Sequence, residues 1–291
     1  MTDGARPGRL SVVGTPIGHL DDVTLRALAT LREADMILAE DTRRTRKLLT
    51  HHGISARVRA LHAHSTDGVI ERCVADLLAG RHLALVTDAG TPLVSDPGSR
   101  LVRAAAERGV TIEGIPGPSA VTAALSVCGV PFDEFHFAGF APRSGGKREA
   151  WIDAIAGRPE ASVFFESPAR LAATLAELAE RLASERPVAV CRELTKVHEQ
   201  VVRGSAAELA RAFEAGARGE VTVVVGAGQP SAARAGEAEA EPASLDPRIA
   251  ELLAQGMSPR DAARNLAREL GRPRREIYAR VQALAERLRQ S

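Results

Sequence analysis

Apolar positions along the first 128 residues follow two alternating patterns. Short continuous apolar runs predict buried β-strands, and stretches in which apolar residues recur every three or four positions predict helices. The expected strands are Arg9–Val13, Asp35–Ala39, Val58–Leu61, Leu83–Thr87 and Val110–Ile115. The expected helices are Asp22–Arg32, Thr42–His52, Gly68–Ala79, Ser99–Arg108 and Ser119–Cys128. Apolar strands that alternate with helices are typical of a parallel sheet covered on both faces, so the sequence predicts an α/β fold.

Polar and glycine residues indicate where some of these helices begin and end. Asp21 and Asp22 are expected to cap the first helix, because their carboxylates can accept hydrogen bonds from its exposed amides. Gly53 and Gly109 are expected to end two others, since glycine readily adopts the left-handed conformation of a helix C-cap.

The alternation continues beyond Gly129 as a second unit. Its expected elements are the strands Ser162–Phe165, Val188–Cys191 and Val221–Val225 and the helices Ala169–Ala183 and Ala206–Ala215. These elements predict a second α/β layer rather than an extension of the first sheet. We therefore assign residues 1–128 to an N-terminal α/β domain and residues 129–226 to a second α/β domain.

The segment Ala227–Ser244 differs in kind from the rest of the chain. Of its 18 residues, 13 are Ala, Gly, Pro or Ser, and none is Val, Ile, Leu or Phe. Such a segment buries too little apolar surface to fold, which predicts a linker over residues 227–245. Helical periodicity returns over residues 246–291, with Ser258 and Pro259 as a helix-start signal and Gly271 as a stop. The expected helices are Pro247–Ala254, Pro259–Glu269 and Arg274–Leu288.

Charge is distributed unevenly over the 291 residues. The whole chain carries a net +1, whereas residues 246–291 contain ten Arg against six Asp or Glu, a net of +4, which leaves −3 for the remainder. The C-terminal helical segment, residues 246–291, is therefore the basic part of the molecule. No apolar run approaches the roughly 18 residues of a membrane span, and the first ten residues lack the apolar core of a signal peptide. We expect a cytoplasmic protein without a membrane partner.

Candidate chemistry lies where the strands end, because ligands of open α/β sheets bind beyond the carboxyl ends of the strands. Several of these loops are rich in Gly and Pro, which allow close backbone approach and hold a loop open. The loops read GTPIG (14–18), EDTR (40–43), DAGTPLVSDPG (88–98), PGPSA (116–120), ESP (166–168) and RELTK (192–196).

Familiar alternatives to such a site are absent from the sequence. No GxGxxG follows a strand and no GxxxxGK[ST] occurs, which excludes a dinucleotide-binding fingerprint, the usual glycine-rich methyltransferase loop and a P-loop. The pairs His51/His52 and His62/His64 lack a neighbouring carboxylate or cysteine at metal-ligand spacing, so no metal site is predicted. The three cysteines are far apart and are expected to be buried and reduced.

Six segments in order along Leu10–Val225 resemble the ribosomal RNA small subunit methyltransferase I family, and the Arg-rich tail resembles its C-terminal helical domain. The segments are VVGTPIGHLDDVTLRAL, LAEDTRRTRKLL, LVTDAGTPLVSDPG, GIPGPSAVTAAL, FFESPARL and RELTKVHEQ. The resemblance implies two α/β domains of the tetrapyrrole-methylase type with a cleft between them, plus a small all-helical C-terminal domain. It further implies 2′-O-methylation of a cytidine in 16S ribosomal RNA, with S-adenosylmethionine as the methyl donor.

The same resemblance implies which residues line the cofactor. By motif position these are Pro16, Asp88, Ala89, Gly90, Thr91, Pro92, Val94, Ser95, Ser119, Ala120, Phe165 and Glu166. The stretch that follows His64 departs from the family's pattern, so no role is assigned to His62 or His64.

A ribose 2′-hydroxyl is a poor nucleophile, and a nearby carboxylate or a lysine of lowered pKa could take its proton. Glu193 and Lys196 are the first candidates because they share one strand-end loop, and Glu40 and Asp41 are the next. RNA contacts are expected at Arg43, Arg272, Arg274, Arg275 and Arg280, and the expected partners are the small ribosomal subunit and a second copy of the chain.

Two other functions remain open from the sequence. One is methylation of a small molecule such as a tetrapyrrole by the same fold, which would not require a distant cationic module. The other is a non-catalytic ribosome-assembly factor, which would not require an intact set of cofactor loops.

Overall fold

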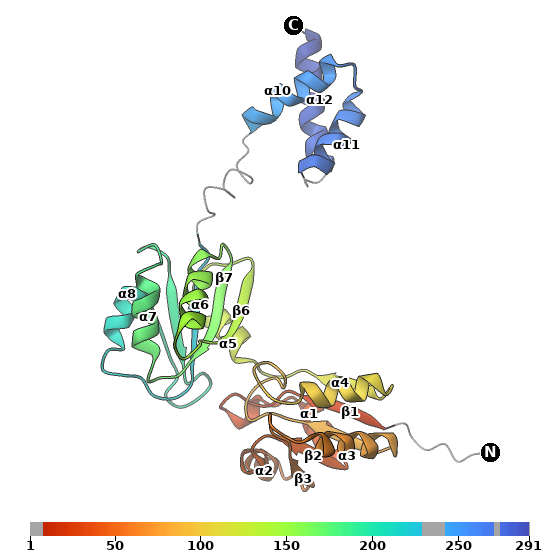
Figure 1. Ribbon diagram of the computed structural model, residues 1–291, viewed down its shortest axis with the longest axis vertical. Coiled ribbons are helices and arrows are strands. Elements are labelled where there is room, and N and C mark those ends of the chain that lie inside the picture. Colours follow the sequence, from red (N-terminus) through yellow and green to blue (C-terminus); the bar gives the residue numbers. More distant parts are fainter. Residues whose placement is uncertain (1–7, 229–241, 271–273, 291) are drawn as a thin grey trace, which may run out of the picture. The chain divides into compact units, whose positions relative to one another are not determined.

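The computed structural model describes residues 8–228, 242–270 and 274–290. The chain forms two compact units, Met1–Gly228 and Gln229–Ser291 (Figure 1). Gly271 and Arg272, which the sequence singles out, lie outside the described residues.

The first sheet is entirely parallel and has the strand order β3-β2-β4-β1-β5. Its strands are β1 (Arg9–Val13), β2 (Met36–Ala39), β3 (Val58–Ala60), β4 (His82–Leu85) and β5 (Thr111–Ile115). The helices between them are α1 (Leu25–Glu33), α2 (Thr42–His51), α3 (Asp67–Leu78) and α4 (Ser99–Glu107). Every expected strand and helix of this sheet is present, and the parallel arrangement is confirmed.

Alternating strand residues fill two separate cores, as a sheet covered on both faces requires. Ile37 packs toward α1 and α2, where Leu31 and Leu48 are buried. Leu38, the next residue along β2, packs toward α3 and α4 with Leu77 and others. Continuous burial on both faces explains why these strands are unbroken apolar runs in the sequence.

The first helix begins differently from the expectation. Asp21 and Asp22 lie in a short 3₁₀ turn, η1 (Leu20–Asp22), and α1 starts three residues later. Its cap is Thr24, whose side chain accepts a hydrogen bond from the amide of Ala27 at 3.1 Å. The prediction of an aspartate cap is therefore wrong, because a threonine nearer the first apolar periodic residue takes that position.

The second sheet is mixed and has the order β6-β7-β10-β8-β9. β10 pairs antiparallel with both of its neighbours, and β8 pairs antiparallel with β9. The elements are β6 (Phe135–Phe140), α6 (Gly146–Gly157), β7 (Ala161–Glu166), α7 (Leu171–Ala179), β8 (Val188–Arg192), β9 (Gln200–Gly204), α8 (Ala206–Ala212) and β10 (Val221–Val225). The sequence analysis missed β6, β9 and α6. Both strands are edge strands with few fully buried residues, so they lack the apolar runs that mark central strands.

Two groups of helices cover the second sheet. α6, α7 and α8 pack on one face around Phe164. The other face is covered by α5 (Ala120–Val127), whose Val121, Ala124 and Leu125 join Val163 in one buried cluster. α5 follows the last strand of the first sheet yet packs on the second, so it connects the two sheets physically (Figure 1).

The second unit contains α10 (Pro242–Ala254), α11 (Pro259–Leu270) and α12 (Arg274–Gln290). Ile249, Leu266 and Val281 are buried in a core of their own. α10 begins within the expected linker, so that Pro247, the expected first residue, lies inside the helix. Among the described residues, no helix is both long and apolar enough to cross a membrane.

Candidate functional site

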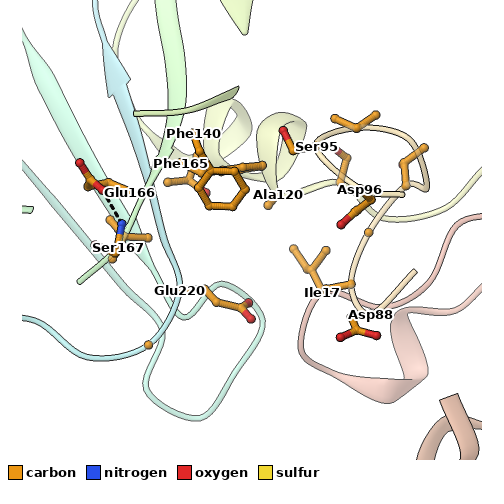
Figure 2. Close-up of a pocket in the computed structure, with 18 of the residues that line it drawn as sticks. Ile17, Asp88, Ser95, Asp96, Ala120, Phe140, Phe165, Glu166, Ser167 and Glu220 are labelled. Atoms are coloured by element: carbon orange, nitrogen blue, oxygen red, sulfur yellow. Dashed lines mark hydrogen bonds between the residues drawn. The ribbon is translucent and has the colours of Figure 1, made fainter. Parts of the chain in front are cut away.

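A cavity of about 390 Å³ lies at the carboxyl edge of the first sheet, against the second sheet. Figure 2 shows its two walls. Ile17, Asp88 and Asp96 come from loops of the first sheet, and Phe140 and Phe165 face them from the ends of β6 and β7. The volume and the mixture of apolar and charged residues are typical of a small-molecule site.

Glycine brings the loops of this cavity into close contact. Gly90 has a φ of 83°, and its backbone exchanges two hydrogen bonds with Thr15, at 2.8 and 3.0 Å. A Cβ atom built on Gly14 would lie 2.8 Å from the Cα of Gly117, and one on Gly117 would lie 2.9 Å from Gly14. Side chains at these positions would separate the three loops that form one wall.

Four residues other than glycine have a positive φ among the described residues. Leu93 and Ser95 lie in the loop after β4, and Glu193 and Thr195 lie in the loop after β8. Such conformations cost free energy and persist where the surrounding structure enforces them, frequently at functional sites. Their restriction to two loops at this edge is independent evidence that the edge is functional.

The lining is rich in carboxylates. Glu40, Asp88, Asp96 and Glu220 line the cavity together with one cation, Arg44. Burial, and to a lesser extent the nearby carboxylates of Glu40 and Asp88, raise the pKa of Asp96 to about 6. The cavity therefore favours a ligand that carries positive charge.

Glu166 lines the cavity, but its carboxylate is bound on the side of the second domain. Arg170 approaches one oxygen at 2.5 Å, the hydroxyl of Thr174 donates to the other at 2.6 Å, and the amide of Ser167 donates at 2.6 Å. The side chain is fully buried. Its hydrogen-bonded carboxylate fixes the end of β7, so that Phe165, the preceding residue, is held at the cavity wall.

A second cavity adjoins the first, with Ile17, Arg44, Asp88, Ala89 and Glu220 in the lining of both. Its volume is about 260 Å³, and it adds two cationic side chains, Lys47 and Lys196, to the shared Arg44. Three cations at one opening can bind an anionic group next to the ligand of the first cavity.

Lys196 lies within a network of carboxylates. Its Nζ donates to Glu193 at 2.8 Å and to Glu220 at 3.1 Å, and the same Glu193 oxygen accepts from the amide of Glu220 at 2.9 Å. Burial lowers the pKa of Lys196, but the hydrogen bonds from its ammonium group to the two carboxylates outweigh burial and raise it. The hydrogen bond from Lys196 lowers the pKa of Glu193. The two carboxylates thus favour the protonated form of Lys196.

Most of the expected cofactor residues line the first cavity. They are Asp88, Ala89, Gly90, Thr91, Val94, Ser95, Ser119, Ala120, Phe165 and Glu166. Pro16 instead lines the second cavity, and Pro92 is buried beside the loop without lining the first. Arg43 is exposed and forms an ion pair with Asp41 at 3.0 Å, and the side chains of Arg274 and Arg275 are not described.

The sequence analysis missed several lining residues: Ile17, Arg44, Asp96, Phe140, Ser167, Pro168, Gly219, Glu220, Val221 and Thr222. Some belong to loops that it did consider, and the last four precede or begin β10. An antiparallel strand enters the sheet at the edge where its neighbours end, so its first residues reach the site. Only the strand direction could have identified them.

Known proteins resemble this chain over most of its length. The model of the family described as Tetrapyrrole (Corrin/Porphyrin) Methylases matches residues 9–210, and that of the RsmI C-terminal HTH domain matches residues 239–285. A relative from Xylella fastidiosa named ribosomal RNA small subunit methyltransferase I is 43% identical over 94% of this chain and 98% of its own length. A relative of the same name from Mycobacterium tuberculosis is 45% identical over 89% of each chain.

The chain belongs to the ribosomal RNA small subunit methyltransferase I family. It is an S-adenosylmethionine-dependent methyltransferase, and the predicted family, fold class and cofactor are confirmed. Solved structures show the same fold: a cobalt precorrin-4 methyltransferase has a TM-score of 0.59 at 19% identity, covering 75% of this chain and 94% of that one. A uroporphyrin-III-C-methyltransferase from Thermus thermophilus has a TM-score of 0.54 at 23% identity, with the same two coverages.

The residues of the first cavity fit S-adenosylmethionine. The cofactor carries a sulfonium and an ammonium group against one carboxylate, which suits an acidic lining. Ile17, Phe140 and Phe165 would offer apolar surface to its adenosyl part, and the carboxylates of Asp88 and Asp96 would hold cationic or hydroxyl groups. The bound cofactor would supply an activated methyl group, and the protein would position it and exclude water.

Gly90 tests the placement of the cofactor in this family member. A Cβ there would lie 3.5 Å from Ile17 Cγ2, and both residues line the cavity. We expect Gly90→Ala to weaken S-adenosylmethionine binding at least about tenfold in calorimetry, since a methyl group would occupy ligand space. Gly109→Ala is the matched control, because Gly109 also has a positive φ but no atom within 4 Å of its Cβ. Equal losses in both variants would show a backbone effect only.

Asp96 predicts a pH dependence of stability. Its raised pKa means that the folded state favours the protonated carboxyl, so this contribution is present below about pH 4 and is lost as the pH rises through about 6. Asp96→Asn should therefore stabilise the protein relative to wild type at pH 8, by about 1–2 kcal/mol for a partly exposed group, and have little effect at pH 4. Denaturant titrations at the two pH values measure the difference. A difference that is the same at both would contradict the assignment.

Proposed function

We propose that this protein transfers the methyl group of S-adenosylmethionine to the ribose 2′-hydroxyl of a cytidine in 16S ribosomal RNA. The observation that carries the proposal is the cationic second cavity, which opens from the cofactor cavity and is lined by Arg44, Lys47 and Lys196. A ribose in RNA is flanked by phosphates, which such cations bind. Relatives named ribosomal RNA small subunit methyltransferase I over nearly the whole chain support the same substrate.

The network around Lys196 suggests how the hydroxyl would be handled. A protonated Lys196 can donate a hydrogen bond to the 2′-oxygen. It would then stabilise the negative charge that develops on this oxygen as the hydroxyl proton leaves. Glu193 fixes both Lys196 and the backbone of Glu220, so it acts as a positioning residue. Glu220 is the carboxylate of this network that lines both cavities, and we assign to it the role of proton acceptor.

The rival functions make different demands on the chain. A tetrapyrrole methyltransferase would act on a small molecule, and the solved structures of that kind resemble this chain at 19–23% identity, which supports the fold alone. A non-catalytic assembly factor would bind RNA without turnover. To test the proposal, the protein is incubated with S-adenosylmethionine and one of two RNA substrates. These are small subunits from a strain lacking the family member, and naked 16S RNA. Mass mapping of the RNA then locates any methyl group. Methyl transfer to neither RNA would overturn it.

Substitutions in the loop after β8 and at the start of β10 test the assigned roles. Lys196→Ala should lower turnover by about 10²–10⁴-fold while retaining cofactor binding, because Lys196 would act on the acceptor. Glu220→Gln should also lower turnover, because it removes the assigned proton acceptor, and Glu193→Gln should lower it less. Lys147→Ala, an exposed lysine on α6, is the control. Turnover within a few-fold of wild type in Lys196→Ala would remove this lysine from the reaction.

The helical tail is proposed to anchor the enzyme on ribosomal RNA. Its net charge of +4 over residues 246–291 suits phosphate binding, and tethering raises the local concentration of the catalytic unit. Arg280 donates to both carboxylate oxygens of Asp246, at 2.8 and 3.1 Å, so it also links α12 to α10. Arg43, the small-subunit context and a homodimer remain predictions.

The salt dependence of binding to the ribosomal subunit distinguishes an RNA-binding role of the helical tail from a purely structural one. A chain that ends at Gly228 should bind cofactor normally but bind the subunit more weakly, with a shallower fall in affinity as salt rises. Charge removal at Arg272, Arg274 and Arg275 should lower the log–log slope by about 0.9 for each phosphate contact, using the duplex DNA value. Arg280→Gln should instead lower the melting temperature of the tail. An unchanged slope in the shortened chain would leave the tail without an RNA-binding role.

A further inference from the structure

A cluster of histidines lies on the surface beside the second cavity. His51 ends α2, His52 follows it, and Asp21 lies in the 3₁₀ turn η1. One ligand atom from each of the three residues lies within 4.8 Å of the others. The sequence analysis excluded a metal here because no carboxylate is near His51 in the chain. The fold supplies a carboxylate from a distant part of the chain: Asp21 is 30 residues from His51 in sequence, and its Oδ1 lies 2.8 Å from His51 Nε2.

The chemistry of this cluster is that of a transition-metal site. Two imidazoles and one carboxylate are a common protein ligand set for Zn²⁺, and a fourth position remains for water. Metal–ligand bonds of about 2.0–2.2 Å place neighbouring ligand atoms about 3.3 Å apart, so exposed side chains need rotate only slightly to enclose an ion. His19, whose Nδ1 lies 3.9 Å from Asp21 Oδ2, is the nearest further imidazole.

His52 already has the support that metal-ligating histidines require. Its Nε2 lies 3.1 Å from the carbonyl oxygen of Leu20, and a carbonyl can only accept, so Nε2 carries the hydrogen. With Nε2 donating in this hydrogen bond, Nδ1 is the ring nitrogen that can bind a metal ion. A hydrogen bond from the second ring nitrogen to a backbone carbonyl fixes the tautomer and orientation of zinc-ligating histidines in the same way.

We infer that Asp21, His51 and His52 form a binding site for Zn²⁺ or a similar borderline divalent cation. The ion would replace the hydrogen shared by Asp21 and His51 and join η1 to the end of α2. Both segments border the second cavity, through Leu20 and Leu48. Metal binding would therefore stabilise the wall of the proposed acceptor cavity, because the ion would hold these two segments together.

Zinc titration of the untagged full-length protein, freed of metal by chelator, tests the site. We expect one Zn²⁺ per chain in competition with a chromogenic chelator, a melting temperature that rises with Zn²⁺, and no comparable effect of Mg²⁺, which prefers oxygen ligands. His51→Ala, His52→Ala and Asp21→Ala should each lower the Zn²⁺ affinity at least about tenfold, the loss that even outer-shell changes typically cause.

His64→Ala is the matched control, because His64 is an exposed histidine outside the cluster. Circular dichroism without metal verifies that each variant folds, which we expect because an exposed ion pair contributes at most about 1 kcal/mol. Equal affinity in wild type and the His51→Ala/His52→Ala double variant would overturn the inference. An equal loss in His64→Ala, or equal stabilisation by Mg²⁺, would also overturn it. After any of these three outcomes, the cluster would be interpreted as an Asp21–His51 ion pair without a metal site.

Discussion

The packing of α5 and Ile17 against the second sheet is the interaction on which the site depends. Ile17 follows the first strand of the first sheet, and α5 follows its last, yet both are buried with Val163 and Val224 of the second sheet. Burial of several aliphatic side chains contributes roughly 1.5–3 kcal/mol each, enough to hold two sheets in one arrangement. This cluster therefore joins the two walls of the cofactor cavity through buried apolar contacts.

Close backbone contacts then set the spacing of the walls. A Cβ on Gly18 would meet Lys196 Cγ at 2.6 Å, and one on Gly219 would meet the Glu193 carboxyl at 2.2 Å. The loop after β1, the loop after β8 and the loop before β10 therefore touch where the two cavities join. The positive φ values of Glu193 and Thr195 are the backbone cost of this contact, and the buried Ile17 cluster offsets it.

Local patterns in the sequence predicted the first sheet well because each central strand is buried on both faces and each helix has one apolar face. Edge strands such as β6 lack that pattern, and Glu220 reaches the site only because β10 runs antiparallel to its neighbours. The Asp21–His51 pair likewise depends on where a turn and a helix end meet. Such features follow from tertiary packing, which neither periodicity nor motif spacing encodes.

The acidic lining of the first cavity has opposite effects on the cofactor and on RNA. An acidic cavity suits a cationic cofactor, but the same carboxylates repel the phosphates of RNA at short range. Lys196 of the second cavity would reduce this repulsion, since its ammonium group lies against Glu193 and against Glu220, which lines both cavities. With Arg44 opposite Asp88 at 3.7 Å, the boundary between the cavities is lined by paired charges. Paired charges present a weak net field to an approaching phosphate, so Lys47 of the second cavity and the excess of arginine in residues 246–291 would supply most of the proposed affinity for RNA.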